Sequence, residues 1–224
     1  MKLKQTLLIS LLAVSAGAHA QIVAMTDSIT EIEISRQTGL IVEDYDTELD
    51  FPYGDTGSGA VDGQTTANTL LFDNSRLISA RVLGISKAGI LSGMSWAAPF
   101  AMANATVKNV SGQPMTVQYN LRTLVDTSIT NVGTVGFGSV VTNWHLKLNG
   151  AFLDSGSKSL VGSGGQLDGY IFQSANNSFI LQPNQSATFE AKITTSLRTE
   201  AVPEPMTLSA LGLGLAALLR KRRS

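Results

Sequence analysis

Ser95 and His145 are the residues whose types could support nucleophilic catalysis. The chain contains no cysteine, and its two histidines are His19 and His145, which excludes a thiol nucleophile and a cysteine-type zinc site. A serine becomes an effective nucleophile only when a neighbouring base accepts its proton. A single histidine beyond the N-terminal segment also falls short of a usual zinc site. We therefore predict no catalytic residue, no metal site and no cofactor.

The segment around Ser95 reads Gly93-Met94-Ser95-Trp96-Ala97-Ala98-Pro99. It resembles the nucleophile segment of subtilisin-like serine proteases, although Met94 replaces the threonine of that family. The family requires an aspartate, then a histidine, then the serine along the chain, and His145 follows Ser95. We therefore interpret residues 95–101 as a turn that enters a strand and expect Ser95→Ala to leave function unchanged.

His145 lies in a segment that alternates apolar and polar side chains. Trp144, Leu146 and Leu148 fall on one face, and His145 and Lys147 fall on the other. This period of two is typical of a half-buried strand. We expect His145 to be an exposed or hydrogen-bonded strand residue.

An acidic segment spans residues 43–55, where hard oxygen ligands could bind calcium. Its spacing does not match the EF-hand loop, so a solvated acidic loop is the simpler interpretation. Together with Asp154 or Asp168, the segment could also supply the carboxylate pair of a glycosidase. The carboxylates are Glu43, Asp44, Asp46, Glu48, Asp50 and Asp55, and the interleaved rings are Tyr45, Phe51 and Tyr53.

The N-terminal segment MKLKQTLLISLLAVSAGAHA is typical of an export signal. Lys2 and Lys4 precede a short apolar stretch, and the small residues Ala18 and Ala20 form a signal-peptidase site. We predict that residues 1–20 are a signal peptide, that signal peptidase cleaves after Ala20, and that His19 is lost with it.

The C-terminal segment has three consecutive parts. Val202-Pro203-Glu204-Pro205 is stiff because each proline restricts itself and the residue before it. An uncharged run of 14 residues, 206–219, follows; as a helix it spans about 21 Å, less than the roughly 30 Å of the hydrocarbon core. Arg220, Lys221, Arg222 and Arg223 then form a membrane stop that stays cytoplasmic by the positive-inside rule.

This three-part tail resembles the PEP-CTERM sorting signal of Gram-negative bacteria, which is also labelled an ice-binding protein C-terminal domain. The resemblance covers residues 202–224. It implies a short transmembrane helix, processing by an exosortase near Pro203-Glu204-Pro205, and transient residence in the inner membrane. It further implies co-occurrence with exopolysaccharide and a destination at the cell-envelope surface or outside the cell.

Residues 21–201 form the predicted exported domain. They hold ten Lys and Arg against sixteen Asp and Glu, a net charge near −6, so we expect no nucleic-acid partner. Period-two alternation and turns rich in Gly, Ser and Asn predict an all-β, antiparallel β-sandwich of about 8–10 strands. Asn149-Gly150 is a strong hairpin signal. The predicted strands are 28–34, 77–85, 101–110, 115–124, 132–148, 167–172 and 188–197, and the other predicted turns are 109–112, 162–165 and 182–184.

The stretch from Leu71-Phe72-Asp73 to Asn109-Val110-Ser111-Gly112 resembles, diffusely, the choice-of-anchor β-domains that precede such tails. The leading hypothesis is an exported, non-enzymatic surface or matrix protein associated with exopolysaccharide or biofilm. Two alternatives stay open. One is an envelope carbohydrate-active enzyme that uses aspartates. The other is a carbohydrate-binding module with Trp96, Trp144 or Tyr53 exposed for sugar stacking.

Overall fold

Long antiparallel strands make up almost all of the folded chain. The computed structural model describes residues 21–57, 59–71, 75–89, 93–132, 135–163 and 166–202, and these residues contain strands and no helix. The twelve strands are β1 (Gln21–Ser35), β2 (Leu40–Asp50), β3 (Tyr53–Gly57), β4 (Ala60–Leu71), β5 (Ser75–Gly89), β6 (Gly93–Ala97), β7 (Phe100–Asn109), β8 (Met115–Val132), β9 (Val135–Leu148), β10 (Ala151–Gly162), β11 (Gln166–Leu181) and β12 (Ser186–Val202).

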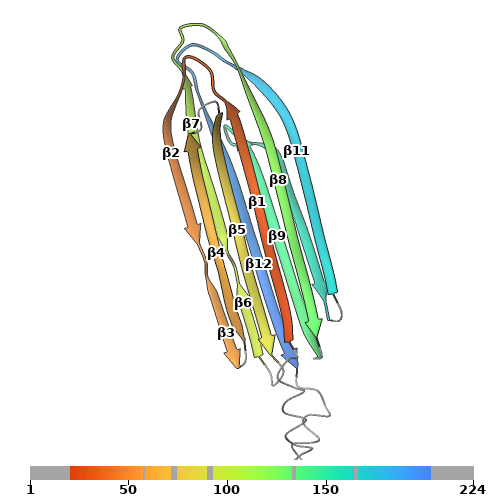
Figure 1. Cartoon of the computed structure of the whole chain (residues 1–224). Helices are drawn as coiled ribbons and strands as arrows, with labels where there is room; N and C mark the ends of the chain where they lie inside the picture. The colour runs from red at the N-terminus through yellow and green to blue at the C-terminus, as the bar shows by residue number, and fades with distance from the viewer. Residues whose placement is uncertain are drawn as a thin grey trace, which may run out of the picture.

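The strands form two sheets that pack face to face in an elongated sandwich (Figure 1). Sheet A has the order β11-β8-β1-β5-β4. Sheet B has the order β10-β9-β12-β6-β3, and β7 lies between β12 and β2. Every pairing in the two sheets is antiparallel. The predicted all-β antiparallel sandwich is confirmed.

Two prolines interrupt strands of sheet B without changing their register. β12 pairs Leu197 with Ala97 of β6 and Thr194 with Phe100 of β7, so β6 and β7 continue each other across Pro99. β2 and β3 continue each other across Pro52 in the same way. A proline donates no backbone hydrogen bond, which explains the breaks in the ladder. The twelve strands therefore correspond to ten full-length ones, in agreement with the predicted number.

The core follows the predicted alternation of inward and outward side chains. The larger of its two apolar clusters lies around Trp144, Phe189 and Tyr119, and the smaller one lies around Ile22 and Leu197. Tyr119 and Phe189 meet edge to face with ring centroids 5.5 Å apart, a favourable aromatic geometry. Burying these side chains provides the main stabilisation of the sandwich.

Buried hydroxyl groups form a polar layer in the sandwich. Thr142 bridges the two sheets, since its Oγ1 lies 3.0 Å from Thr195 Oγ1 and 3.4 Å from Thr26 Oγ1. A second contact joins Thr30 Oγ1 to Thr123 Oγ1 at 3.0 Å. Hydrogen bonding among these groups offsets the cost of removing them from water.

The backbone φ angles support the predicted turns that the structure describes. Asn149 and Gly150 join β9 to β10 with φ values of 50° and 80°, as a two-residue type I′ hairpin requires. Asn184, between β11 and β12, also has a positive φ of 59°. In the loop between β7 and β8, Asn109 Oδ1 accepts a hydrogen bond from the backbone N–H of Ser111. Residues 164–165 of the predicted turn 162–165 lie outside the described residues.

All seven predicted strands overlap strands of the structure, but two segments differ from the prediction. The acidic segment 43–55 lies in β2 and β3 instead of forming a loop. An edge strand that is exposed on both faces carries no apolar alternation, which explains why its sequence suggested a loop. Residues 93–97 form strand β6, so the turn predicted for residues 95–101 is confined to Ala98 and Pro99.

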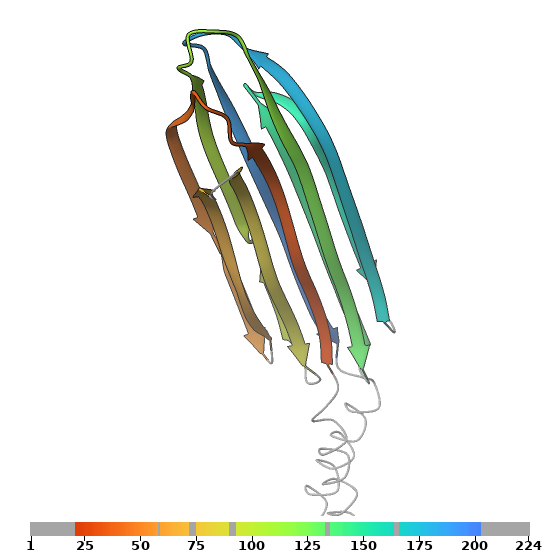
Figure 2. The ribbon, with the colours of Figure 1, turned by 45° about the horizontal axis from the view of Figure 1, so that its top comes forward.

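Both ends of the sandwich domain lie at the same end of the molecule. Gln21 pairs with Val132 at the end of β8, and Val202 pairs with Val135 at the start of β9. Figure 2 shows that β1 begins and β12 ends at this end. The opposite end, with the β7–β8 and β11–β12 connections, is therefore the far end of the domain. At about 3.4 Å per residue, the 17 residues of β12 extend roughly 55 Å.

Candidate functional site

Of the predicted sorting and cleavage residues, the structure describes Val202 alone. Val202 is the last residue of β12 and its side chain is exposed, whereas Ala201 is buried. Pro203, Glu204, Pro205, Arg220, Lys221, Arg222 and Arg223 lie outside the described residues, as do Ala18 and Ala20. Within the described ranges, no helix is long and apolar enough to span a membrane. The predicted signal peptide and tail helix fall outside these ranges.

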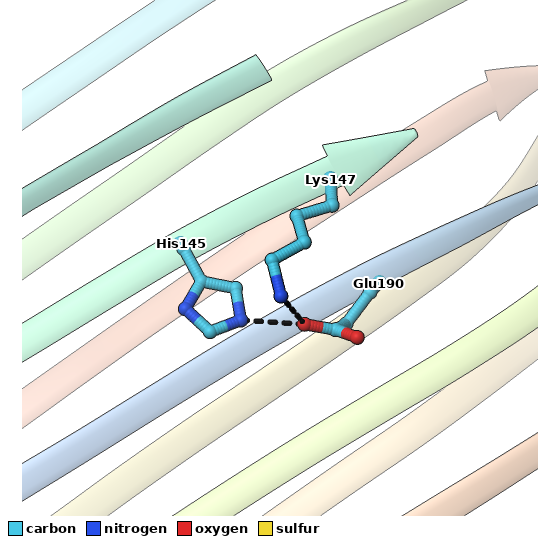
Figure 3. A network of polar contacts seen from close by, with 3 residues as sticks. All are labelled: His145, Lys147 and Glu190. Atoms are coloured by element: carbon cyan, nitrogen blue, oxygen red, sulfur yellow. Dashed lines mark hydrogen bonds and ion pairs between the residues drawn. The ribbon is translucent and has the colours of Figure 1, made fainter. Parts of the chain in front are cut away.

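His145, Lys147 and Glu190 form a polar cluster on the outer face of sheet B (Figure 3). The alternation of β9 places His145 and Lys147 on this face, and β12 presents Glu190 beside them. The Nε2 atom of His145 lies 2.5 Å from Glu190 Oε1, and Lys147 Nζ donates to the same oxygen at 2.9 Å. His145 is therefore a hydrogen-bonded strand residue, as predicted.

The cluster shifts the proton affinities of two of its members. Burial lowers the pKa of His145, and the charge of Lys147 adds to this, while the hydrogen bond that His145 donates to Glu190 opposes it. Burial alone would raise the pKa of Glu190, but hydrogen bonds and charge from Lys147 and His145 outweigh it and lower that pKa. The favoured state is a neutral His145 beside an ionised Glu190.

Aromatic rings flank this cluster and complete its packing. The His145 ring meets Phe152 of β10 edge to face at 5.6 Å, and Lys147 Nζ lies 5.1 Å from the Phe152 ring centroid. On the same face Lys192 lies 4.7 Å from the Phe100 centroid. Such cation–π contacts stabilise a surface modestly. The polar groups are engaged with one another, which is typical of a structural cluster.

Ser95 is buried in β6, where its Oγ lies 2.9 Å from Thr199 Oγ1 of β12. His145 lies on the outer face of sheet B, whereas the Ser95 side chain points into the core. The structure therefore does not bring these two residues together as a nucleophile and its base.

The acidic residues of β2 do not converge on a metal site. Asp44, Asp46 and Asp50 each accept a hydrogen bond from the backbone N–H of the following residue. Glu43 accepts hydrogen bonds from Lys108 and Ser186, which lower its pKa. Among the described residues, no group of three or more acidic or histidine side chains is arranged to hold a metal ion.

The three aromatic residues considered for sugar stacking differ in their exposure to solvent. Trp144 is buried in the core, with 4% of its surface exposed, and its Nε1–H points to Asp154 Oδ2 at 3.4 Å. Trp96 and Tyr53 are exposed at 40% and 63%. These two rings lie on opposite faces of sheet B, because Trp96 pairs with Gly54 and not with Tyr53.

The outer face of sheet A carries a shallow polar depression of about 160 Å³, which the sequence analysis did not identify. Arg122 lies 3.6 Å from Glu31 and stacks 5.9 Å from the centroid of Phe172. The depression draws side chains from three neighbouring strands, so no single segment of sequence reveals it. It is lined by Glu31, Glu33, Asn120, Leu121, Arg122, Ser174 and Asn176.

The sequence pattern alone does not reveal Glu190 as the partner of His145 and Lys147. The alternation of β9 and β12 placed the three residues on outer faces, but only the register shows that they are neighbours. Lys192 pairs directly with His145, and Glu190 pairs with Lys147. A hydrophobic pattern indicates which side chains of a strand point toward the core, but it does not indicate which strand lies next to it.

Comparison with known proteins identifies the C-terminal segment. The PEP-CTERM protein-sorting motif matches residues 201–223. No curated protein matches the chain, and no solved structure matches it. The match begins at the buried end of β12 and covers the Pro-Glu-Pro, the apolar run and the basic residues. This chain therefore carries a PEP-CTERM sorting signal directly after its β-sandwich.

Proposed function

We propose that this chain is a non-enzymatic protein displayed at the cell surface or in the extracellular matrix, where it associates with exopolysaccharide. The PEP-CTERM motif implies export and sorting by an exosortase. The proposal adds the final location, the absence of catalysis and the polysaccharide partner.

The observation that carries this proposal is the position of both domain ends at one end of the sandwich. A domain joined to its sorting tail through Val202 would project the β7–β8 and β11–β12 connections away from the point of attachment. Long strands with continuous hydrogen bonding suit a stiff spacer or display module. The hydrogen-bonded His145 cluster and the buried Ser95 are consistent with structural roles.

The carbohydrate-active enzyme that uses aspartates remains a second hypothesis. It requires two carboxyl groups about 5–10 Å apart that face each other across a cleft. Asp44, Asp46 and Asp50 of β2 each accept a hydrogen bond from the backbone N–H of the following residue.

The carbohydrate-binding module is better supported, by the depression on sheet A. Its carboxylate, amide, hydroxyl and guanidinium groups are the types that bind sugar hydroxyls, and Phe172 offers a ring beside them. Cosedimentation with exopolysaccharide tests this alternative. Arg122→Ala should reduce binding, whereas Arg198→Ala on sheet B should leave it unchanged.

Surface labelling tests the display proposal. The sequence has no cysteine, so Val110→Cys places one exposed thiol at the far end of the sandwich. We expect a membrane-impermeant maleimide to label this variant on intact cells that possess the exosortase. Loss of the exosortase should abolish labelling. Equal labelling with and without the enzyme, or none in either strain, would contradict the proposal.

A further inference from the structure

Strand β11 forms an edge of sheet A that lacks the usual protection against pairing with another strand. Its 16 residues pair with β8 in continuous register from Gln166 to Leu181. Residues 169–181 contain no charged residue and no proline. Soluble β-proteins usually protect an edge with charges, prolines or bulges, because its free backbone groups can accept another strand.

The edges of sheet B show such protection. β2 contains a bulge between Val42 and Asp44 and a row of carboxylates, and Pro52 separates it from β3. β10 contains a bulge between Phe152 and Asp154 and carries Lys158. Two β2 edges would repel each other, whereas residues 169–181 of two β11 edges carry no charge and would not. Charges and bulges therefore argue against the edges of sheet B. The other edge of sheet A, β4, also carries a single carboxylate, Asp62, and it is the exposed apolar residues Tyr170 and Ile180 that favour β11 as the edge that accepts a second copy.

We propose that two copies of this chain pair through β11 across a two-fold axis that passes beside Ala175. Antiparallel pairing about this residue preserves the face of every side chain, because residues of the same parity stand opposite each other. Tyr170 then meets Ile180 of the second copy on the outer face, and Ile171 meets Phe179 on the inner face. Each of these two contacts occurs twice because of the two-fold symmetry. The interface is therefore isologous and closed.

The side chains of β11 suit this register. Tyr170 and Ile180 are 62% and 61% exposed in the single chain, so their pairing would remove apolar surface from water. The polar centre, residues 173–177, would align with itself. Apolar cross-strand pairs at both ends of the shared ladder favour this register over a shifted one.

Each copy carries one depression on its sheet A. The proposed two-fold axis would bring the depressions of the two copies together into one groove. Existing pairs align Glu31 with Arg122 and Arg122 with Ser174 across three strands. In the dimer, Ser174 stands opposite Asn176 of the second copy, which adjoins that copy's Asn120. The second copy therefore contributes half of the polar lining. This inference concerns the folded domain and does not rest on the proposed function.

Cysteine cross-linking tests the proposed axis, because the sequence contains no other thiol. Residues directly opposite in an antiparallel pair have Cβ atoms about 4.5–5.5 Å apart, close enough for a disulfide after a small adjustment. We expect Ala175→Cys in the purified exported protein to form a disulfide-linked dimer under mild oxidation. Ser157→Cys, an exposed residue of the β10 edge, is the matched control and should remain monomeric on a reducing-agent-free gel.

Mixed variants test the register. Tyr170→Cys mixed with Ile180→Cys should give the heterodimer, while each variant alone should give little cross-linked product. Strong linkage of Tyr170→Cys to itself would overturn the register.

Measurement of solution mass tests the dimer without cross-linking. The purified exported protein should show twice the monomer mass in sedimentation equilibrium. Ala175→Lys should shift it to the monomer mass, because two lysines would face each other on the axis, whereas Ser157→Lys should remain dimeric. A wild-type protein that stays monomeric and whose Ala175→Cys variant does not cross-link overturns the proposal. Growth into open polymers would also overturn it, because a closed two-fold pair uses both β11 edges.

Discussion

At the residue scale, the burial of His145 and the hydrogen bonds of Glu190 should make stability depend on pH. The folded pKa of His145 lies below its value of 6.5 in an unfolded chain, so on acidification the unfolded chain takes up the proton first. Stability should therefore fall as the pH drops from about 6.5 through the lower folded pKa. Glu190 also has a lowered pKa, so its contribution is present above about 4.5 and is lost as the pH falls through its folded pKa.

We expect His145→Gln to weaken the pH dependence of the free energy of unfolding just below pH 6.5. The change in that free energy should be less than about 1 kcal/mol, because the pair is partly exposed. Glu190→Gln should steepen the pH dependence in that same region, since it removes the negative charge of the acceptor that raises the pKa of His145. Urea unfolding at several pH values measures both effects. Asn143→Gln, an exposed change on β9, is the control. Parallel profiles for the wild type and His145→Gln would show that the histidine does not contribute.

Ser95 should matter for stability and not for catalysis. Its contact with Thr199 lies between buried hydroxyls, and a hydrogen bond of this kind contributes about 1 kcal/mol. We expect Ser95→Ala to lower the free energy of unfolding by about that amount without changing localisation. The double variant Ser95→Ala with Thr199→Val should lose less than the two single variants together, because both polar partners are then removed. Labelling of wild-type Ser95 by a fluorophosphonate probe would contradict this structural role.

At the element scale, close contact between neighbouring strands limits substitution of Gly156. This residue of β10 pairs with Trp144 of β9, and a Cβ atom at Gly156 would collide with the Trp144 indole. Because Trp144 is buried, it has little room to move. We expect Gly156→Ala to destabilise the protein by about 1–3 kcal/mol, measured by thermal unfolding and tryptophan fluorescence. Ser155→Ala, at the neighbouring exposed position, should cost far less, and equal losses would argue against the steric explanation.

The strands whose sequence alternates toward the core could be predicted, whereas the edge strands were predicted only in part, as for residues 167–172 of β11, or not at all. The segment 188–197 alternates around Phe189, Ala191 and Ile193, and all three are buried in β12. By contrast, β2 is exposed on both faces from Glu43 onward. Its alternation places Asp44, Asp46, Glu48 and Asp50 on one face and Tyr45, Thr47 and Leu49 on the other, and does not indicate burial. β6 is short and its inward-facing residues are small, so its sequence resembles that of a turn.

The polar sites depended on register, which local sequence does not specify. His145 and Lys147 could be assigned to an outer face, but Glu190 joins them only through the pairing of β12 with β9. The depression on sheet A likewise combines β1, β8 and β11. Such long-range pairings depend on the packing of the whole sandwich.

At the scale of the whole molecule, the sandwich determines where the sorting signal begins. Ala201 is buried and paired with Gly136, and Val202 is the last residue of the ladder. The PEP-CTERM match starts at Ala201, so the Pro-Glu-Pro follows the folded domain without an intervening linker. A proline at position 203 cannot donate to a continued ladder. Pro203 directly follows Val202, so the strand end and the Pro-Glu-Pro are adjacent in the sequence.

This arrangement yields a prediction for processing. The apolar run of 14 residues would span about 21 Å as a helix, too short for a comfortable permanent anchor in a hydrocarbon core of about 30 Å. We therefore expect the mature protein to lack residues 206–224. Replacing Pro203, Glu204 and Pro205 with alanine should trap an unprocessed, membrane-bound form. Mass spectrometric mapping of the C-terminal peptide from wild-type and variant protein measures the outcome.

Glu200→Ala is the matched control for that experiment, because it removes a carboxylate just upstream of the matched motif. Glu200 pairs with Arg198 at 3.0 Å on an exposed face, and such pairs contribute little to stability. The control should therefore be processed and released like the wild type. If its processing fails equally, the loss of processing is not specific to the Pro-Glu-Pro. If native protein from the envelope or the medium still ends in Arg220-Lys221-Arg222-Arg223-Ser224, the tail acts as a plain anchor and removal of residues 206–224 does not occur.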